Sequence, residues 1–286
     1  MEYKFVKDYS DNEMLRKSFS ELAKETFGID FEKWYDAKGW NSNYIPYSFS
    51  HENKIISNVS VNTMELMISG EIHKAIQIGT VMTEKGHRGQ GLASRLMEKV
   101  LEDFDEEYSV YFLAADEKAV PLYERYGFSP VKTKRFILET SSFTKREKPL
   151  VSEPMSIEDL LEYKRASLPL SMKFSAIGDK HILVFYYVHG FDRFIYKLSD
   201  DTLVLFEMEE NELHLYDIFS KKKVDLKEII EKILPLDAEK VIFHFIPDEN
   251  LEGLRTEEDP EAGWMIRILD DSKLPEDLAF PDISKA

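Results

Sequence analysis

The sequence contains no cysteine among its 286 residues, and this absence excludes disulfide bonds, thiolate metal ligands and an acyl-enzyme formed on a cysteine. Long apolar runs are missing too. None approaches the roughly 20 residues that cross a bilayer, and the first residues, Met-Glu-Tyr-Lys-Phe, have no secretory character. We therefore predict a cytoplasmic protein that does not bind a membrane.

Several motifs of enzyme chemistry are also absent. Neither Gly-x-Gly-x-x-Gly nor the Gly-Lys-Ser/Thr ending of an ATP-binding P-loop occurs. No Gly-x-Ser-x-Gly elbow provides a serine nucleophile. The histidines show no His-Glu-x-x-His or other ligand spacing, so we predict no metal site. They are His51, His73, His87, His181, His189, His214 and His244.

The chain carries a formal net charge of −17, which argues against nucleic acid as a partner. Such a charge serves solubility or steers cationic substrates toward the protein. It is uneven: residues 1–140 hold 18 Lys and Arg against 23 Asp and Glu, whereas residues 141–286 hold 19 against 31. Length favours two domains, and the polar, proline-ended stretch 141–149 resembles a linker. We predict domains 1–147 and 148–286, and leave homo-oligomerisation open.

Residues 78–93 join an apolar strand to a glycine-containing turn and then a helix, an arrangement suited to binding phosphate. Gly89 and Gly91 permit backbone conformations that a Cβ disfavours, and they bring N–H groups close to an anion. The helix from Ala93 to about Asp103 adds the positive end of its dipole. The pattern that remains is Arg88-x-x-Gly91-x-Ala93.

At these residues the sequence resembles the GCN5-related N-acetyltransferase (GNAT) superfamily, whose acetyl-CoA pyrophosphate binds an Arg/Gln-x-x-Gly-x-Gly/Ala turn. Residues 81–83, Val-Met-Thr, match the end of the family's central strand, and residues 122–128, Leu-Tyr-Glu-Arg-Tyr-Gly-Phe, match its LYxxxGF segment. The resemblance covers roughly residues 1–140. The whole chain is distantly similar to the enhanced-intracellular-survival acetyltransferases. The resemblance implies acetyl-CoA as co-substrate and direct acetyl transfer to a primary amine of a small molecule or peptide in a ternary complex.

The resemblance also implies which residues contact the cofactor. Backbone amides at the strand end would pair with the pantetheine arm and polarise the thioester carbonyl, while the turn and the first helical residues would bind pyrophosphate. Arg88 would add a permanent charge; the alternative is an exposed turn arginine. The predicted cofactor-binding residues are Val81, Met82, Thr83, Arg88, Gly89, Gln90, Gly91, Leu92, Ala93, Ser94 and Asp116.

Two of the implied roles have structural alternatives. Tyr123 occupies the tyrosine position of the LYxxxGF segment and is the candidate general acid for the departing thiolate; the alternative is a core aromatic on an amphipathic helix. Asp116 stands where many relatives carry a cofactor-contacting asparagine, and capping of the Glu117 helix is its simpler role.

No residue stands out as the general base that takes the amine proton. The candidates are Glu25, Glu65, Glu71, His73, Gln77 through a bound water, and the Ala286 carboxylate. The aromatic residues of the segment that walls the acceptor site in this superfamily would line a pocket or simply pack the core. They are Phe27, Phe31, Trp34, Tyr35, Trp40, Tyr44, Tyr47 and Phe49.

Periodicity and turn residues predict an α+β fold: a mixed, mostly antiparallel sheet flanked by helices, as in acyl-CoA N-acyltransferases. In the first half we expect helices at 13–26, 31–37, 93–103 and 117–126, and strands at 54–64, 71–82, 110–115, 128–131 and 135–139. In the second half we expect strands at 201–208, 212–219, 240–246 and 264–269 and a helix at 225–234.

The second half repeats the strand, strand, helix, strand order without a glycine turn, because residues 220–225 read Ser-Lys-Lys-Lys-Val-Asp. We interpret it as a degenerate second copy of the fold; a sterol-carrier-like domain is the alternative. The competing function for the whole chain is a non-catalytic acyl-CoA sensor or protein-interaction module.

Overall fold

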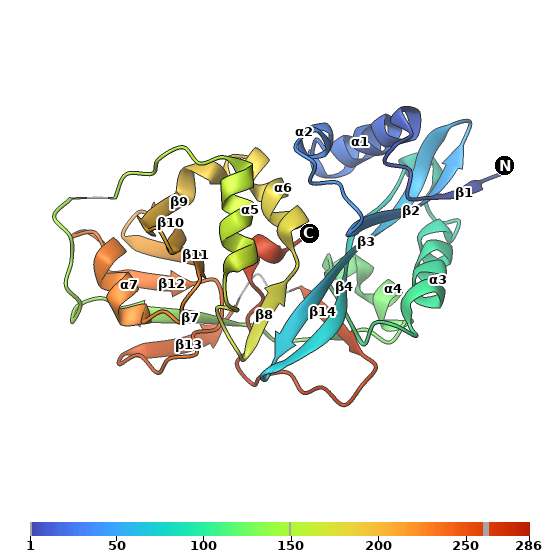
Figure 1. Cartoon of the computed structure of the whole chain (residues 1–286). Helices are drawn as coiled ribbons and strands as arrows, with labels where there is room; N and C mark the ends of the chain where they lie inside the picture. The colour runs from blue at the N-terminus through green and yellow to red at the C-terminus, as the bar shows by residue number, and fades with distance from the viewer. Residues whose placement is uncertain (1, 149, 260–262) are drawn as a thin grey trace.

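Two β-sheets lie side by side in the computed structural model, which describes residues 2–148, 150–259 and 263–286 (Figure 1). In the first sheet the only parallel pair among the described strands is β4 with β5. Its strands, in spatial order, are β1 (Lys4–Lys7), β2 (Tyr44–His51), β3 (Lys54–Ile68), β4 (Glu71–Thr83), β5 (Val110–Ala114), β14 (Trp264–Ile268) and β6 (Ser129–Pro130), with β8 (Phe174–Ile177) beside β3.

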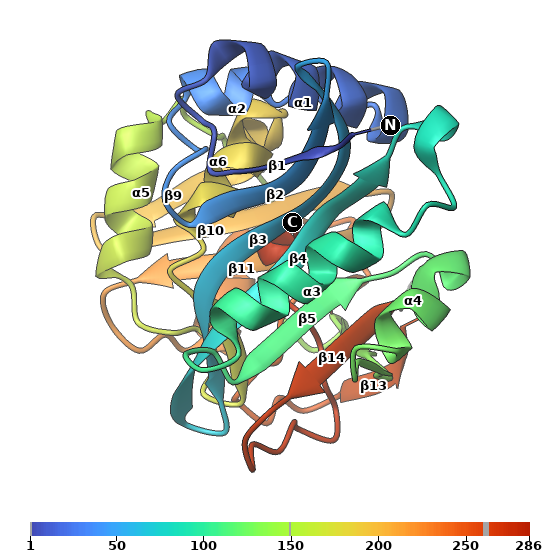
Figure 2. The ribbon, with the colours of Figure 1, turned by 90° about the vertical axis from the view of Figure 1, so that its right-hand side faces the viewer.

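Helices cover both faces of this sheet. On one face α1 (Glu13–Phe27) and α2 (Glu32–Asp36) pack over Tyr44 and Ile55. On the other face α3 (Leu92–Phe104) packs against β2, β3 and β4, as Figure 2 shows, with α4 (Val120–Glu124) nearby. The sequence sets these ends locally: Asn12 caps α1, and Gly28 ends it in the left-handed conformation. Short 3-10 helices η1 (Lys85–His87) and η2 (Glu117–Ala119) precede α3 and α4.

The second sheet contains β13 (Leu254–Glu258), β7 (Lys134–Glu139), β12 (Lys240–Phe243), β11 (Glu212–Ser220), β10 (Thr202–Glu209) and β9 (Ile195–Ser199), in that order. The predicted order of hairpin, helix and strand is confirmed: β10 and β11 are antiparallel, α7 (Leu226–Ile233) follows, and β12 lies parallel to β11. The remaining helices of this half are α5 (Ile157–Ala166), α6 (Lys180–Val188), η3 (Phe191–Phe194) and η4 (Asp282–Ser284). Its interpretation as a second copy stays a prediction.

Two strands, β7 and β14, do not belong to the sheets in which we predicted them. β7 was expected to complete the first sheet, but it pairs with β12 and β13 in the second. β14 was expected in the second half, but it lies between β5 and β6 in the first sheet. The division into domains at residue 147 stays a prediction, and the two sheets exchange strands across it.

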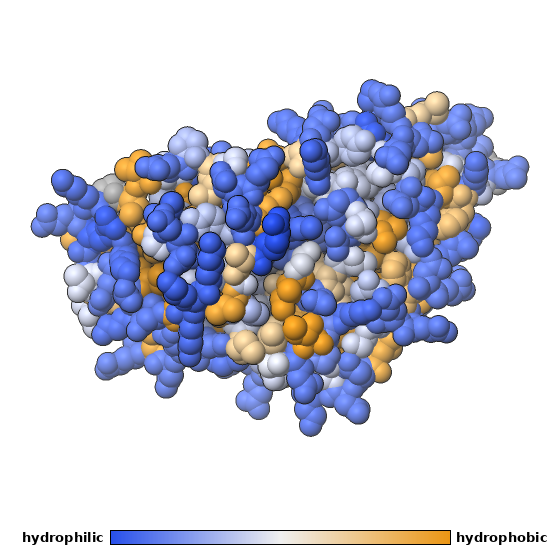
Figure 3. All heavy atoms as spheres, in the orientation of Figure 1, coloured by the Kyte–Doolittle hydropathy of each residue, from blue (hydrophilic) through white to orange (hydrophobic). Residues whose placement is uncertain are grey.

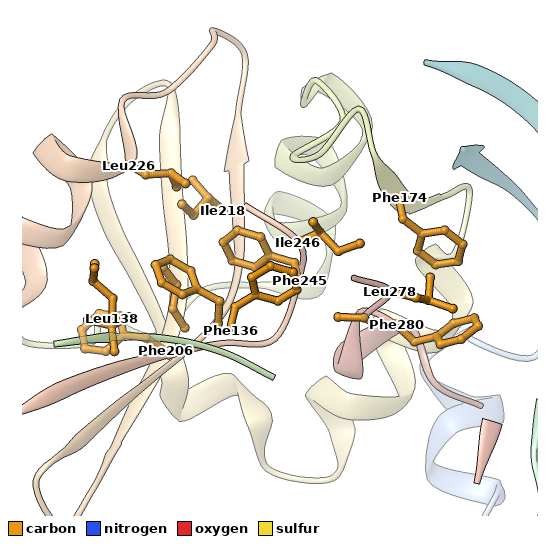
Figure 4. Packing of buried hydrophobic residues seen from close by; sticks show 14 of the residues in the cluster. Phe136, Leu138, Phe174, Phe206, Ile218, Leu226, Phe245, Ile246, Leu278 and Phe280 are labelled. Carbon is orange, nitrogen blue, oxygen red and sulfur yellow. The ribbon is translucent and has the colours of Figure 1, made fainter. Parts of the chain in front are cut away.

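One apolar core joins the two sheets, because its residues come from β3 and β5 as well as from β7, β10, β11 and β12. Figure 4 shows this cluster extending from Phe206 and Leu138 to Phe174, Leu278 and Phe280. Phe280 stacks on Trp264 with ring centroids 4.0 Å apart. Phe280 is therefore held against β14 of the first sheet. Seen in the orientation of Figure 1, the outer surface is mostly hydrophilic, with smaller apolar areas (Figure 3).

Candidate active site

The central feature of the site is the separation of β4 and β5. These parallel strands pair only from Ala75 with Val110 to Gln77 with Phe112. Beyond Gln77, β4 continues to Thr83 while β5 ends at Ala114, so the β5-facing backbone groups of β4 lose their sheet partners. Unpaired N–H and C=O groups of this kind must find another hydrogen-bonding partner. An extended amide such as a pantetheine arm is a suitable partner.

An irregularity in β4 adds to this opening. The register of β3 and β4 shifts between Asn58 and Ser60, and Thr80 on the opposite strand has a φ of 49°, which is uncommon for a residue with a Cβ. Asn58 Nδ2 stabilises the bulge by donating to the Thr80 carbonyl at 2.8 Å. The bulge interrupts the ladder at Thr80 and Val81, and Met82 and Thr83 pair with β3 again.

The glycine turn lies between β4 and α3, as predicted. Gly89 and Gly91 have φ values of 74° and 72°, and a Cβ at either position would meet no heavy atom within 4 Å. The turn therefore requires glycine for its left-handed backbone and not for lack of space. Gly91 is the N-cap of α3 and Leu92 its first, buried residue. The N–H groups of the first helical turn, which includes Ala93 and Ser94, have no acceptor within the helix.

Side chains around the turn hold its shape. Exposed Arg88 donates from Nε to the Thr83 carbonyl at 2.9 Å, which closes the loop over η1. Tyr3 donates from its hydroxyl to Gln90 Oε1 at 2.9 Å and contacts His87 Nδ1 at 2.7 Å. His87 is partly buried by these contacts. No local pattern in the sequence predicted that Tyr3 would reach the turn.

Tyr123 lies in α4 at 5% exposure, with its ring 6.1 Å from that of Phe128. It also lines a cavity of about 540 Å³ at the opening of β4 and β5, so it combines core packing with access to the site. Burial, and to a lesser degree the nearby Asp116 charge, raises the pKa of Tyr123 to about 12. The phenol therefore keeps its proton at neutral pH.

Asp116 does not cap the helix that follows it, although capping was its simpler predicted role. It precedes η2, but its side chain makes no capping hydrogen bond. The carboxylate is exposed and lines the cavity instead. Pro121, the second residue of α4, restricts the backbone there, so the short helix forms without a side-chain cap. α4 ends at Glu124, two residues before the predicted end, and Gly127 follows with a φ of 82°.

Aromatic side chains form one wall of this cavity, which we call the acceptor cavity. Of the aromatic residues singled out in the sequence, those that line it are Phe27, Phe31, Trp34 and Tyr44. Trp40, Tyr47 and Phe49 pack in the core, and Tyr35 stacks on the Arg16 guanidinium at 3.7 Å. A further aromatic residue, Phe185 of α6, completes the wall. No local sequence signal linked Phe185 to the site.

Most of the candidate bases lie away from the cavity. His73 is near the start of β4 and contacts Asp270 at 3.3 Å, about ten residues of extended chain from the turn. Glu25, Glu65 and Glu71 are exposed and do not line the cavity. Ala286 lines it, and its main-chain N–H donates to Gln77 Oε1 at 3.1 Å.

Gln77 has an unusual environment. It is fully buried, and its Nε2 has no hydrogen-bonding partner among the described residues. A buried amide donor without a partner is costly, so a water or ligand atom is expected next to it.

Two residues behind the cavity were missed by the sequence analysis. Asn62 lines the cavity, and its Oδ1 lies 3.2 Å from Nε2 of the fully buried His181. Burial lowers the pKa of His181 to about 4, so the imidazole is neutral and Nε2–H donates to Asn62. The amide of Asn62 in turn donates to the Gln77 carbonyl at 3.3 Å. An isolated histidine in the second half gave no signal of this contact.

Neither a metal cluster nor a membrane span is found in the part of the chain that the structure describes. No three His, Asp or Glu side chains there are grouped to hold a metal ion. No helix there is both long and apolar enough to cross a bilayer.

The fold and the separated strands define the class of protein: an acyl-CoA N-acyltransferase fold of the GNAT type. Solved structures agree. This chain is 12% identical to Eis1 from Mycobacterium abscessus, with a TM-score of 0.64 over 94% of this chain and 74% of that one. It is 13% identical to a probable N-acyltransferase of unknown function from Enterococcus faecalis, with a TM-score of 0.63 over 94% and 73%. A GCN5-related N-acetyltransferase from Kribbella flavida is similar at 14% identity, with a TM-score of 0.63 over 94% and 72%.

Sequence comparison agrees for the first part of the chain. Residues 12–131 match the model of the acetyltransferase (GNAT) domain. No curated protein matches the sequence. This part of the chain thus resembles a GNAT acetyltransferase domain.

Proposed function

We propose that this protein is an acetyl-CoA-dependent N-acetyltransferase that acts on a primary amine through a ternary complex. The observation that carries the proposal is the single opening where three features meet: the free edge of β4 beyond Gln77, the glycine turn at α3, and the acceptor cavity with Tyr123. Backbone amides from residue 81 to residue 83 would align the pantetheine arm, and residues 88–94 would hold the phosphate end.

Acetyl-CoA supplies a thioester whose acetyl group passes to the amine as the C–N bond forms and the C–S bond breaks. The Val81 and Thr83 amides polarise the carbonyl through the hydrogen bonds that β5 leaves free. Tyr123, protonated at neutral pH, gives its proton to the departing sulfur. The amine proton leaves through a water bound at Gln77, on the side of the cavity where Ala286 also lies.

The acceptor is a small amine with an apolar or aromatic part. Phe31, Trp34 and Phe185 offer an aromatic wall, and Asp116 adds a carboxylate at the rim. An aromatic wall attracts both apolar surface and a cationic ammonium group.

Thermal unfolding with and without acetyl-CoA tests the proposal, because a ligand that binds only the folded state raises the melting temperature. We expect acetyl-CoA to raise the melting temperature of the wild type and not that of Gly91→Trp. In a second experiment, a panel of primary amines is added with acetyl-CoA, and we expect at least one amine to cause release of CoA. A shift without CoA release for any amine would favour the acyl-CoA sensor. No shift at millimolar acetyl-CoA would reject both functions and leave the protein-interaction module.

A further inference from the structure

Residues 281–286 form a wall shared by several cavities; we call them the closing segment. Lys285 and Ala286 line the acceptor cavity. On the other side Asp282 and Lys285 line a polar cavity of about 590 Å³, which also contains His214 and His244. A displacement of the closing segment would therefore change the shape of the acceptor cavity.

Hydrogen bonds attach this segment to surrounding elements. Tyr186 of α6 donates from its hydroxyl to the Asp282 carbonyl at 2.7 Å and contacts the Lys285 carbonyl at 3.2 Å. Ser284 donates to the buried Asp179 at 2.5 Å. These contacts, with the bond from Ala286 to Gln77, involve the main chain or a small hydroxyl. The carboxylate of Asp282 makes a different contact, a short hydrogen bond to Nδ1 of His244.

The direction of this bond places a proton on His244. The Asp282 carboxylate only accepts, so His244 carries a proton on Nδ1. The other ring nitrogen of His244, Nε2, lies 2.9 Å from Nδ1 of His214, and the two imidazoles share a hydrogen bond there. His214 thus supports His244 from the side opposite to Asp282. The ring of Tyr216 stacks on His244 with centroids 4.3 Å apart and fixes its plane.

The surrounding charges are compatible with this arrangement. The second nitrogen of His214, Nε2, lies 3.8 Å from both Glu209 and Glu212, so a proton taken up there leaves the two bonds along the chain intact. The Glu207 carboxylate is occupied by the Tyr216 hydroxyl. The other charged residues that line this cavity are Lys134, Arg135, Glu210, Asp259 and Lys285.

We propose that His244 is a positioning residue: through Asp282 it holds the closing segment in the place where that segment shapes the acceptor cavity, and His214 supports it through a hydrogen bond on the other side of its ring. This inference rests on the proposed acetyltransferase function for its kinetic consequence, although the attachment itself does not. His244 is partly buried and lines the polar cavity, not the acceptor cavity, so it acts through Asp282 and not on the substrate.

Paired variants test the inference. His244→Leu removes both hydrogen bonds, whereas His244→Asn places an amide N–H close to the position of Nδ1 and keeps the bond to Asp282. We expect His244→Leu to raise the acceptor KM about ten-fold, because a hydrogen bond to a charged group is lost. His244→Asn should recover most of this loss, and the acetyl-CoA KM should stay unchanged in both. His73→Leu is the control, since that imidazole contacts Asp270 and Ser272 and lines neither of the two cavities.

Hydrogen–deuterium exchange separates this inference from the proposed function, because it needs no turnover. In the protein without substrates, His244→Leu should increase exchange in the peptide over residues 278–286, and His244→Asn should not. If His244→Leu does not fold, Asp282→Asn replaces it, and we expect the same increase in exchange over residues 278–286. Increased exchange without any acetyl transfer by the wild type would retain the attachment and reject the enzyme. Wild-type exchange in both His244→Leu and Asp282→Asn, or equal loss in the leucine and asparagine variants, would overturn the inference.

Discussion

The indole Nε1 of Trp34 donates a hydrogen bond of 2.7 Å to the main-chain carbonyl of His181. It joins α2, near the start of the chain, to α6, which lies beyond the predicted boundary at residue 147. Trp34 is 2% exposed, and its ring lies 6.1 Å from that of Phe185. The aromatic wall of the acceptor cavity is thus built by both halves of the chain.

The position of Trp34 depends on a glycine. A Cβ at Gly39 would lie 1.9 Å from the indole Nε1. Gly39→Ala therefore has to displace the ring, at a cost of about 1–3 kcal/mol of folding free energy. We expect lower stability in urea and a raised acceptor KM. Gly86→Ala is the matched control, because a Cβ there meets nothing within 4 Å. Equal behaviour of the two variants would contradict the predicted clash.

Substitution in the glycine turn should act through backbone strain and not through a steric clash. A Cβ at Gly91 has space, but the backbone there is left-handed. Gly91→Ala should cost about 1 kcal/mol of strain and weaken acetyl-CoA binding several-fold as the turn relaxes. Gly190→Ala introduces comparable strain, at a φ of 99°, away from the turn. Calorimetric titration of both variants with acetyl-CoA distinguishes them. If Gly190→Ala weakens binding as much as Gly91→Ala, the effect comes from general destabilisation.

The sequence predicted the turn well because its signal is local: Gly89, Gly91 and the helix after them are contiguous, and backbone conformation follows from residue type. It did not predict the partners of β7 and β14. β14 pairs Trp264 with Ala114, and neither periodicity nor turn residues specify which distant strand a segment joins. The same reason explains why Phe185 was missed. The cavity wall is formed by residues far apart in the sequence, whereas the glycine turn is formed by neighbouring residues.

Tyr123→Phe tests the general acid. The phenylalanine keeps the ring that packs on Phe128, so stability should change little, while kcat falls by about 100-fold. Because burial raises the pKa of Tyr123 to about 12, this group should not cause a loss of kcat near neutral pH. Tyr126→Phe is the control for kcat: its hydroxyl donates to the Ser94 carbonyl at 3.0 Å, and the residue does not line the acceptor cavity. An unchanged kcat in Tyr123→Phe removes that hydroxyl from the mechanism.

His181 predicts how stability depends on pH. Its pKa is lowered from the ordinary 6.5 to about 4 by burial, so the unfolded chain binds a proton between these values that the folded chain does not. Stability contributed by the neutral imidazole is therefore complete above pH 6.5 and falls as the pH drops to about 4, by a total on the order of 3 kcal/mol. His181→Gln places an amide near Nε2 for the bond to Asn62 and does not titrate. Urea unfolding at several pH values between 7.5 and 4.5 should show a smaller acid loss for His181→Gln than for the wild type. The exposed His189→Gln should keep the wild-type slope, and an identical slope in all three proteins would mean that His181 is protonated in the folded state.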